Sequence, residues 1–326
     1  MLADVLADRC RAKWDDWFGE RAPARIDLSF VASRARSDER AVALVFVDRR
    51  LRAALKLAVG MRPGLQREHE VLRYLARHSN LKGSVPQVLG TGYEQVGFRA
   101  AGHEVPEPLW MLPLHPLGGS IWRPPDPGRA ISAREFADVE RILRELDGLT
   151  AQIGDDGAPP EVLPLGVNWR TGVRLLSVDK HHRFQLEAHY PEMPASREPT
   201  RWAHGDLAPG NVRVSSSKVA ALLDWEMFDP AYEPWFDGLY PALLALSSVL
   251  LQRVCPPAAS WPIRWLRVLA SESGSVPIQV RCLRVTAELA SRSAQLHRGS
   301  IERWRYLAHY LEEGTEIGGV PSSVQQ

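Results

Sequence analysis

The side chains best suited to chemistry in this sequence are Asp206, Asn211 and Asp224. Asp206 and Asn211 lie in a segment that reads as a loop, and a hairpin over residues 212–223 would bring Asp224 back beside them. Carboxylate and amide oxygens are the ligands that Mg²⁺ prefers, and proteins usually supply only one or two of them. Asn211 and Asp224 suit that role, whereas Asp206 suits a general base that orients an incoming hydroxyl. Such a set serves phosphoryl transfer, which depends mainly on positioning and charge neutralisation.

A simpler interpretation exists for each of these residues, because Asp and Asn favour turns in any protein. What favours function is the whole set in order along the chain, together with Lys56. Lys56 lies between Leu55 and Leu57 in a strand-like run, although a surface lysine on an edge strand would show the same pattern. Arginine heavily outnumbers lysine in this chain, so a lysine with apolar neighbours stands out.

The elements that must position these residues begin with an amphipathic helix and continue as short strands. Apolar residues recur at helical spacing near the N-terminus and alternate with polar residues further on. The predicted elements are a helix over 1–26, strands over 41–47 and 51–59 joined by a turn at 48–50, a helix over 65–78, and strands over 85–93 and 109–114.

A stretch rich in proline and glycine over residues 113–130 cannot form regular structure, so it predicts a boundary between two lobes. The expected domains are residues 1–114, a nucleotide-binding lobe with a leading helix, and residues 115–326, a helical lobe with the catalytic loop and acceptor site. Ser132 followed by Glu135 predicts a capping box at the start of a helix. Further helices are predicted around 167–178, 235–254, 261–272, 277–297 and 300–313.

Composition excludes several classes of protein. The chain has 326 residues, 45% of them hydrophobic and 24% charged, which is ordinary for a globular protein. A formal net charge of +1 gives no general attraction to nucleic acid or to a membrane surface. The three cysteines form no Cys-x-x-Cys pair, no signal-peptide pattern begins the chain, and the longest apolar run, 239–251, is too short to span a bilayer. We therefore expect a cytoplasmic protein that binds neither nucleic acid nor membranes.

The segment around Asp206 resembles the catalytic loop of the aminoglycoside phosphotransferase family, kinase-fold enzymes that mostly phosphorylate hydroxyl groups of small molecules. The His-Gly-Asp triplet at 204–206 with Asn211 matches that loop, and the Asp-Trp-Glu triplet at 224–226 is similar to the family's metal-binding triplet. The resemblance implies an α+β, two-lobed protein-kinase-like fold with a small antiparallel sheet in the N-lobe and a larger, mainly helical C-lobe. It also implies that Asp206 is the catalytic base and that Asn211 and Asp224 bind Mg²⁺.

Earlier segments resemble the same family in the right order, so the resemblance covers roughly residues 28–240. It implies that Lys56 contacts the α- and β-phosphates of ATP or GTP, and that Glu68 at the start of the next helix pairs with this lysine. Glu70 is the competing candidate for that pair. Residues 110–114 resemble the strand and hinge on which the purine base stacks. The residues implied to bind the nucleotide are Lys56, Glu68, Met111 and Leu114.

Two features depart from the family pattern. The turn that should cover the phosphates, residues 32–40, has no glycine and carries arginine and serine instead. Pro113 has no N–H, so one hinge hydrogen bond to the base cannot come from that position. Both features bear on nucleotide choice, and the sequence leaves ATP and GTP open.

The resemblance leaves the acceptor open among antibiotics, amino sugars, sugars and amino alcohols. Two rival interpretations remain. The same machinery serves a kinase that acts on Ser or Thr of a peptide or protein. The other rival is a pseudokinase that binds nucleotide without catalysis, and the missing glycines are its only support.

Several other residues are expected to have supporting or structural roles. The resemblance implies that His204 supports the loop from behind and that Asp229 and Asp237 brace it. The pair of histidines at 181–182 has no third ligand at a sensible spacing, so a solvated surface is the simpler interpretation. Acidic residues between 302 and 316 are interpreted as a solvated helix face.

Overall fold

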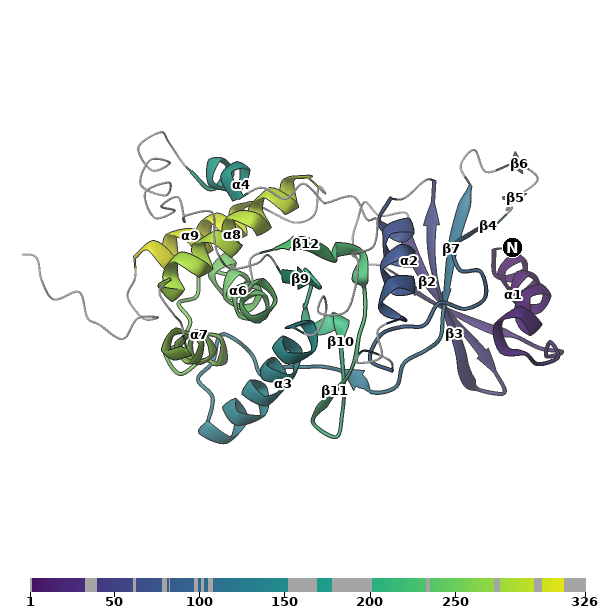
Figure 1. The fold of residues 1–326 in the computed structure, drawn as a ribbon, viewed down its shortest axis with the longest axis horizontal. Coiled ribbons are helices and arrows are strands. Elements are labelled where there is room, and N and C mark those ends of the chain that lie inside the picture. The colour runs from purple at the N-terminus through teal and green to yellow at the C-terminus, as the bar shows by residue number, and fades with distance from the viewer. Residues whose placement is uncertain are drawn as a thin grey trace, which may run out of the picture. The chain divides into compact units, whose positions relative to one another are not determined.

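The structure is a computed structural model, and in it the chain forms two compact units. The first comprises the described residues of 1–120 together with 220–228, and the second comprises the described residues of 121–219 and those from 229 onward (Figure 1). The residues that the structure describes are 2–32, 40–60, 63–77, 81, 83–96, 99–100, 103–104, 108–151, 169–177, 201–232, 235–272, 276–295 and 301–313.

An antiparallel five-stranded sheet is the centre of the first unit. Its strands are β1 (Asp27–Ala32), β2 (Arg40–Val47), β3 (Arg50–Val59), β7 (Leu109–Leu114) and β4 (Glu94–Val96), in that spatial order. The short strands β5 (Arg99–Ala100) and β6 (His103–Glu104) form a separate pair. Along β3 the side chains of Ala53, Leu55 and Leu57 are buried on one face, which leaves Lys56 on the other.

Two helices cover the two faces of this sheet. Helix α1 (Leu2–Phe18) packs on the face of Leu55, where its own Leu6 and Trp14 join the same hydrophobic core. Helix α2 (Pro63–Leu75) lies on the other face, the face of Lys56 (Figure 1). The expected helices are therefore present, although α1 ends at Phe18 and not at residue 26.

The hairpin of β2 and β3 confirms the pair of strands that the sequence predicted. Asp48 and Arg49 both adopt positive φ angles, 49° and 63°, as the favoured two-residue hairpin turn requires. The register shifts once between Val45 and Phe46, so the turn and this irregularity together set which face Lys56 occupies.

The expected strand over residues 85–93 is wrong. That segment is irregular apart from an isolated antiparallel bridge between Val88 and Leu114, and β4 begins only at residue 94. Gly90 and Gly92 adopt positive φ angles, 58° and 86°, which interrupt the extended backbone of a strand.

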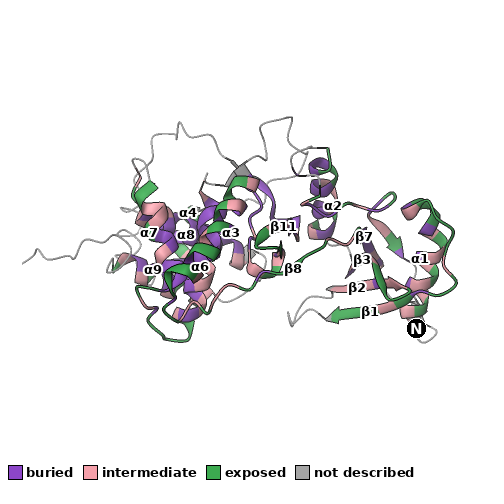
Figure 2. Cartoon of the chain, turned by 90° about the horizontal axis from the view of Figure 1, so that it is seen from below, coloured by how far each residue is buried: buried purple, intermediate pink, exposed green. Residues whose placement is uncertain are grey.

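The second unit is mainly helical. Its helices are α3 (Ala133–Ala151), α4 (Trp169–Leu176), α6 (Phe236–Leu251), α7 (Trp261–Glu272), α8 (Ile278–Gln295) and α9 (Ile301–Glu312). Two further small sheets occur among the described residues: β9 (Arg201–Ala203) pairs with β12 (Asp229–Tyr232), and β10 (Val212–Ser215) lies between β8 (Ser120–Ile121) and β11 (Lys218–Leu222). Helix α6, predicted around residues 235–254, is apolar and largely buried (Figure 2). No described helix combines the length and apolarity that crossing a bilayer needs.

Helix α3 begins at the predicted capping box. The N–H of Ser132 donates to Oε2 of Glu135 at 2.8 Å, and the N–H of Glu135 donates to the Ser132 hydroxyl at 3.2 Å. These reciprocal bonds satisfy two backbone donors that a helix start leaves without partners.

Helices α4 and α8 approach each other closely at Gly172. A Cβ atom at this position would lie 1.7 Å from the carbonyl oxygen of Ala287. Only glycine permits this approach, so the docking of α4 depends on the absence of a side chain at residue 172.

The three cysteines differ in exposure, and none forms a disulfide. Cys10 in α1 and Cys282 in α8 are buried, whereas Cys255 is exposed. Burial raises the pKa of the Cys10 thiol to about 12 and also raises the pKa of Cys282, so both remain protonated thiols at neutral pH.

Candidate functional site

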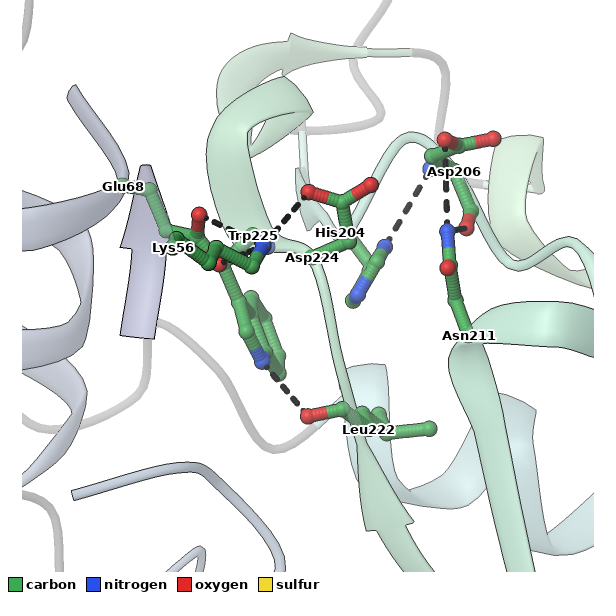
Figure 3. A network of polar contacts seen from close by, with 8 residues as sticks. All are labelled: Lys56, Glu68, His204, Asp206, Asn211, Leu222, Asp224 and Trp225. Carbon is green, nitrogen blue, oxygen red and sulfur yellow. Dashed lines mark hydrogen bonds and ion pairs between the residues drawn. The ribbon is translucent and has the colours of Figure 1, made fainter. Parts of the chain in front are cut away.

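Lys56 lies between two carboxylates within the first unit. Its Nζ atom lies 2.7 Å from both carboxylate oxygens of Glu68 and 2.9 Å from Oδ1 of Asp224 (Figure 3). The predicted pairing with Glu68 is therefore confirmed, and Glu70 instead accepts a hydrogen bond from Gln66 at 3.1 Å. The alternation along β3 places Lys56 on the face of the sheet where α2 presents Glu68.

Burial distinguishes the members of this cluster. The side chain of Glu68 is 2% exposed, whereas Lys56 retains 22% and Asp224 32%. Burial alone would lower the pKa of Lys56, but Asp224 and Glu68 outweigh it and raise that pKa, so the ammonium keeps its charge. Burial raises the pKa of Glu68, and the Lys56 ammonium opposes the rise. Asp224 is thus the carboxylate that a phosphate or a metal ion can reach, while Glu68 anchors the lysine.

The segment that carries Asp224 is fixed to α2 by contacts that the sequence did not indicate. Asp224 adopts a left-handed conformation (φ 63°, ψ 66°), which Asp tolerates better than most residues. The N–H of the next residue, Trp225, donates to Oε1 of Glu68 at 3.2 Å. Its buried indole donates to the carbonyl of Leu222 at 3.0 Å. Glu68 therefore fixes both the lysine and the turn that presents Asp224.

Strand β7 carries the two apolar residues that the sequence assigned to nucleotide binding. Both are buried, but they lie on different faces: Leu114 pairs with Ala54 on the face of Lys56, whereas Met111 pairs with Leu57 and joins the hydrophobic core beneath α1. The carbonyl of Pro113 accepts a hydrogen bond from the N–H of Leu89 at 3.0 Å. Pro113 therefore has no N–H to donate, and its carbonyl already has a partner. Contact of Leu114 with a base stays a prediction, whereas the burial of Met111 on the α1 face speaks against its assignment to the base.

A second set of polar residues is built around Asp206 in the second unit. Gly205 adopts a positive φ of 77°, and its N–H donates to Oδ1 of Asp237 at 3.0 Å. The N–H of His204 donates to Oδ2 of the same carboxylate at 2.7 Å. The fully buried His204 ring accepts the N–H of Asp206 through Nδ1 at 3.2 Å (Figure 3). These contacts confirm that His204 supports the loop and that Asp237 braces it.

Asn211 closes the loop that begins at Asp206. Its Nδ2 donates to the Asp206 carbonyl at 2.9 Å and lies 3.3 Å from Oδ2 of the Asp206 side chain. The short 3₁₀ helix η2 (Pro209–Asn211) sets this reach. Because the amide nitrogen is engaged within the loop, the amide oxygen is the atom left to bind a ligand. An amide oxygen is a hard donor of the kind that Mg²⁺ prefers.

Tyr240 and Arg292 also contact Asp206, and sequence reasoning missed both. The Tyr240 hydroxyl donates to Oδ1 of Asp206 at 2.6 Å, and Nη2 of Arg292 lies 3.6 Å from the same oxygen. Tyr240 follows Asp237 by three residues on one helix, and this spacing was the available signal for a shared face. Arg292 lies on α8, far along the chain, and no local pattern marks it.

The remaining candidates differ in what the structure says of them. Asp229 is buried and lies opposite Ala203 in the β9–β12 pair, and Glu226 is buried after Trp225. Residues 33–39 of the glycine-free turn expected over 32–40, the histidines at 181–182 and the acidic residue at 316 lie outside the described residues.

A model of the phosphotransferase enzyme family matches residues 34–237 of this sequence. The comparison with curated proteins found no match. The matched residues include Lys56, Glu68 and Asp224, the loop around Asp206 and Asn211, and Asp237.

Solved structures share the fold over nearly the whole chain. A thermostable variant of the aminoglycoside phosphotransferase APH(4)-Ia, in ternary complex with AMP-PNP and hygromycin B, has a TM-score of 0.52 and 14% identity, covering 96% of this chain and 98% of that one. A putative aminoglycoside phosphotransferase from Ralstonia eutropha has a TM-score of 0.51 and 13% identity, covering 95% and 98%. ADP-bound APH(2'')-Ib has a TM-score of 0.51 and 11% identity, covering 98% and 99%. The expected α+β, kinase-like fold is confirmed, with an antiparallel-sheet N-lobe and a helical C-lobe.

Proposed function

Because the chain belongs to the phosphotransferase enzyme family, we propose that it transfers the γ-phosphate of ATP or GTP to a hydroxyl group of a small molecule. The observation that carries the proposal is the Lys56 ammonium, held 2.7 Å from Glu68 and 2.9 Å from Asp224. A charged lysine held by a buried glutamate is a fixed point charge for phosphate oxygens.

Lys56 binds the α- and β-phosphates in this proposal, and Glu68 keeps the ammonium in place. The buried glutamate gives the lysine one defined position, so less side-chain freedom is lost when the nucleotide binds. Leu114, which lies opposite Ala54 on the face of Lys56, contributes apolar surface for the base. With Pro113 unable to donate, the base is recognised more by stacking than by hinge hydrogen bonds, which is consistent with use of either ATP or GTP.

Asp206 orients the acceptor hydroxyl and takes its proton. As the acceptor oxygen bonds to the γ-phosphorus, the bond from that phosphorus to the β–γ bridging oxygen breaks, and the nucleoside diphosphate leaves with the electron pair. A general base of this kind contributes roughly 10²–10⁴-fold to the rate. Asn211 and Asp224 would hold Mg²⁺, and when bound the ion neutralises charge on the phosphate oxygens.

The acceptor is proposed to be a small molecule such as an antibiotic, amino sugar, sugar or amino alcohol. The solved structure of the APH(4)-Ia variant is a ternary complex with AMP-PNP and hygromycin B, which supports a small hydroxylated acceptor. Acceptor panels should therefore begin with aminoglycosides and extend to simple sugars and amino alcohols.

The test measures phosphate transfer by purified protein with Mg²⁺ and either ATP or GTP against that acceptor panel. We expect acceptor-dependent nucleoside diphosphate formation that Asp206→Ala lowers by at least about a hundredfold. Asp138→Ala is the matched control, because Asp138 is an exposed carboxylate of α3 in the same unit.

Failure to bind either nucleotide would sink the proposal. Binding without transfer to any small acceptor, accompanied by transfer to a Ser- or Thr-containing peptide, would replace the small molecule by a peptide acceptor. Binding with no transfer at all would indicate a pseudokinase.

A further inference from the structure

Asp206 is held by two helices of the second unit as well as by its own loop. Helix α6 supplies Tyr240, whose hydroxyl donates to Oδ1 of Asp206 at 2.6 Å. Helix α8 supplies Arg292, whose Nη2 lies 3.6 Å from the same oxygen and whose Nη1 donates to the carbonyl of Gly205. Both contacts on the side chain converge on Oδ1, so the two carboxylate oxygens of Asp206 have different surroundings.

We propose that Tyr240 and Arg292 are positioning residues for phosphoryl transfer, which orient Asp206 so that Oδ2 is the oxygen that receives the acceptor proton. This inference rests on the proposed function of Asp206. Oδ1 contacts the phenol and the guanidinium, whereas among the described residues Oδ2 contacts only the amide of Asn211, at 3.3 Å. One carboxylate oxygen is thereby assigned to the protein and the other to the reaction.

The burial of these side chains restricts rotation of the Asp206 carboxylate. Tyr240 is 5% exposed, and the side chains of Arg292 and Asp206 are 10% and 18% exposed. Burial raises the pKa of Tyr240 well above its usual value, so the phenol keeps its proton and continues to donate at neutral pH. A buried hydroxyl that lost this acceptor would remain desolvated and unsatisfied, so rotation of the carboxylate away from Tyr240 is unfavourable.

Arg292 supports both the carboxylate and the phenol. Its guanidinium lies 5.8 Å from the centre of the Tyr240 ring, within range of a cation–π contact. Its bond to the Gly205 carbonyl complements Asp237, which accepts the N–H of the same residue. Gly205, the residue that precedes Asp206, is therefore held at both its N–H and its carbonyl, which limits the angles that the carboxylate can sample.

Orientation matters here because the acceptor proton moves while the new O–P bond forms. In that step the acceptor O–H bond breaks, the proton goes to Oδ2, and the oxygen bonds to the γ-phosphorus as the diphosphate leaves. Phosphoryl transfer depends mainly on positioning, so a misplaced carboxylate lowers the rate more than it weakens nucleotide binding.

The first arm of the test compares Tyr240→Phe with the parent protein in the transfer assay, with Tyr306→Phe as the matched control. Tyr306 bonds to Glu302 on the exposed face of α9. We expect Tyr240→Phe to lower kcat by about tenfold to a hundredfold while the KM for nucleotide changes by less than about twofold. Arg292→Lys should retain more of the parent kcat than Arg292→Gln, because it keeps the charge. An unchanged kcat in Tyr240→Phe, or a fall in kcat matched by an equal loss of nucleotide affinity and folded protein, overturns the proposal.

The second arm needs no turnover. Urea unfolding of the parent, Tyr240→Phe, Asp206→Ala and the double variant forms a cycle that reports whether the two side chains interact. We expect the double variant to be destabilised by less than the sum of the single changes. Additive effects overturn the inference even if the enzyme is active. Absence of transfer by the parent protein counts against the proposed function alone, and the cycle then still decides whether Tyr240 holds Asp206.

Discussion

At the scale of single residues, three buried or partly buried carboxylates have different partners and therefore different tasks. Glu68 accepts the Lys56 ammonium, Asp237 accepts two backbone N–H groups, and Asp206 accepts the hydroxyl of Tyr240. Within the part of the chain that the structure describes, Asp206 keeps one oxygen, Oδ2, whose contact is a single long one with the Asn211 amide. The partners, more than the residue type, thus separate an anchor, a brace and a reacting group.

Removal of the Lys56 charge tests whether Glu68 acts as the anchor of this lysine. Lys56→Met leaves the carboxylates of Glu68 and Asp224 without the ammonium between them, so we expect kcat/KM for nucleotide to fall by about a hundredfold. The free energy of unfolding should fall by about 1–3 kcal/mol, less than for a fully buried pair because Lys56 is 22% exposed. Nucleotide kinetics and urea unfolding measure the two effects. Lys218→Met, at an exposed lysine, should change neither.

The pH dependence of the free energy of unfolding tests the role of Asp237 as a brace. Burial raises the pKa of Asp237 to about 7 from 3.8 in the unfolded chain, although the bonds from Gly205 and His204 oppose the rise. The folded state therefore binds this proton more tightly, and the stability it contributes is full below about pH 4 and is lost as the pH rises to about 7. Asp237→Asn cannot titrate. The unfolding free energy of the parent minus that of the variant should therefore decrease as the pH rises from about 4 to about 7. An increase in this quantity would contradict the assignment.

The sequence predicted those site residues whose neighbours are near in the chain or marked by a motif. Glu68 lies near the start of the helix that follows the strand of Lys56, and the His-Gly-Asp triplet marks Asp206. It did not predict Tyr240 or Arg292, because their contacts with Asp206 depend on how two distant helices pack. A tyrosine inside an apolar helix looks like a core residue until its hydroxyl is seen to have a partner.

At the scale of elements, segments with a strong hydrophobic periodicity were predicted correctly, whereas a segment with a weak periodicity was not. Helices α3 and α6 and the β2–β3 hairpin appear where their patterns placed them. The segment over 85–93 has apolar residues typical of a strand, but its glycines take positive φ angles. Composition alone could not reveal those backbone conformations.

Helix docking gives a prediction at this scale. Gly172→Ala places a methyl group where only 1.7 Å separates it from the Ala287 carbonyl, so α4 must shift away from α8. We expect a loss of about 1–3 kcal/mol in the free energy of unfolding, measured by urea titration. Gly148→Ala in α3 is the matched control, because nothing lies within 4 Å of its added Cβ, and it should stabilise by about 0.5–1 kcal/mol. Equal effects of the two changes would refute the close approach.

At the scale of the whole molecule, the first unit is discontinuous in sequence. The chain leaves it at residue 120, returns for residues 220–228 and leaves again. That return delivers Asp224 and Trp225 to Lys56 and Glu68. A fragment that ends at residue 120 would therefore lack half of the lysine's ion pairs, and fragments of this chain are poor tests of nucleotide binding.

The distribution of the cysteines gives each unit a chemical reporter of its own. An alkylating reagent at neutral pH should modify Cys255 within minutes, since it is the exposed thiol, and leave Cys10 and Cys282 unmodified. Pulses of reagent at increasing urea, followed by peptide mass mapping, would then time the opening of the first unit through Cys10 and of the second through Cys282. Modification of both at one urea concentration would mean that the units unfold together, and modification at separate concentrations that each unfolds alone. Rapid labelling of all three without urea would contradict the burial of α1 and α8.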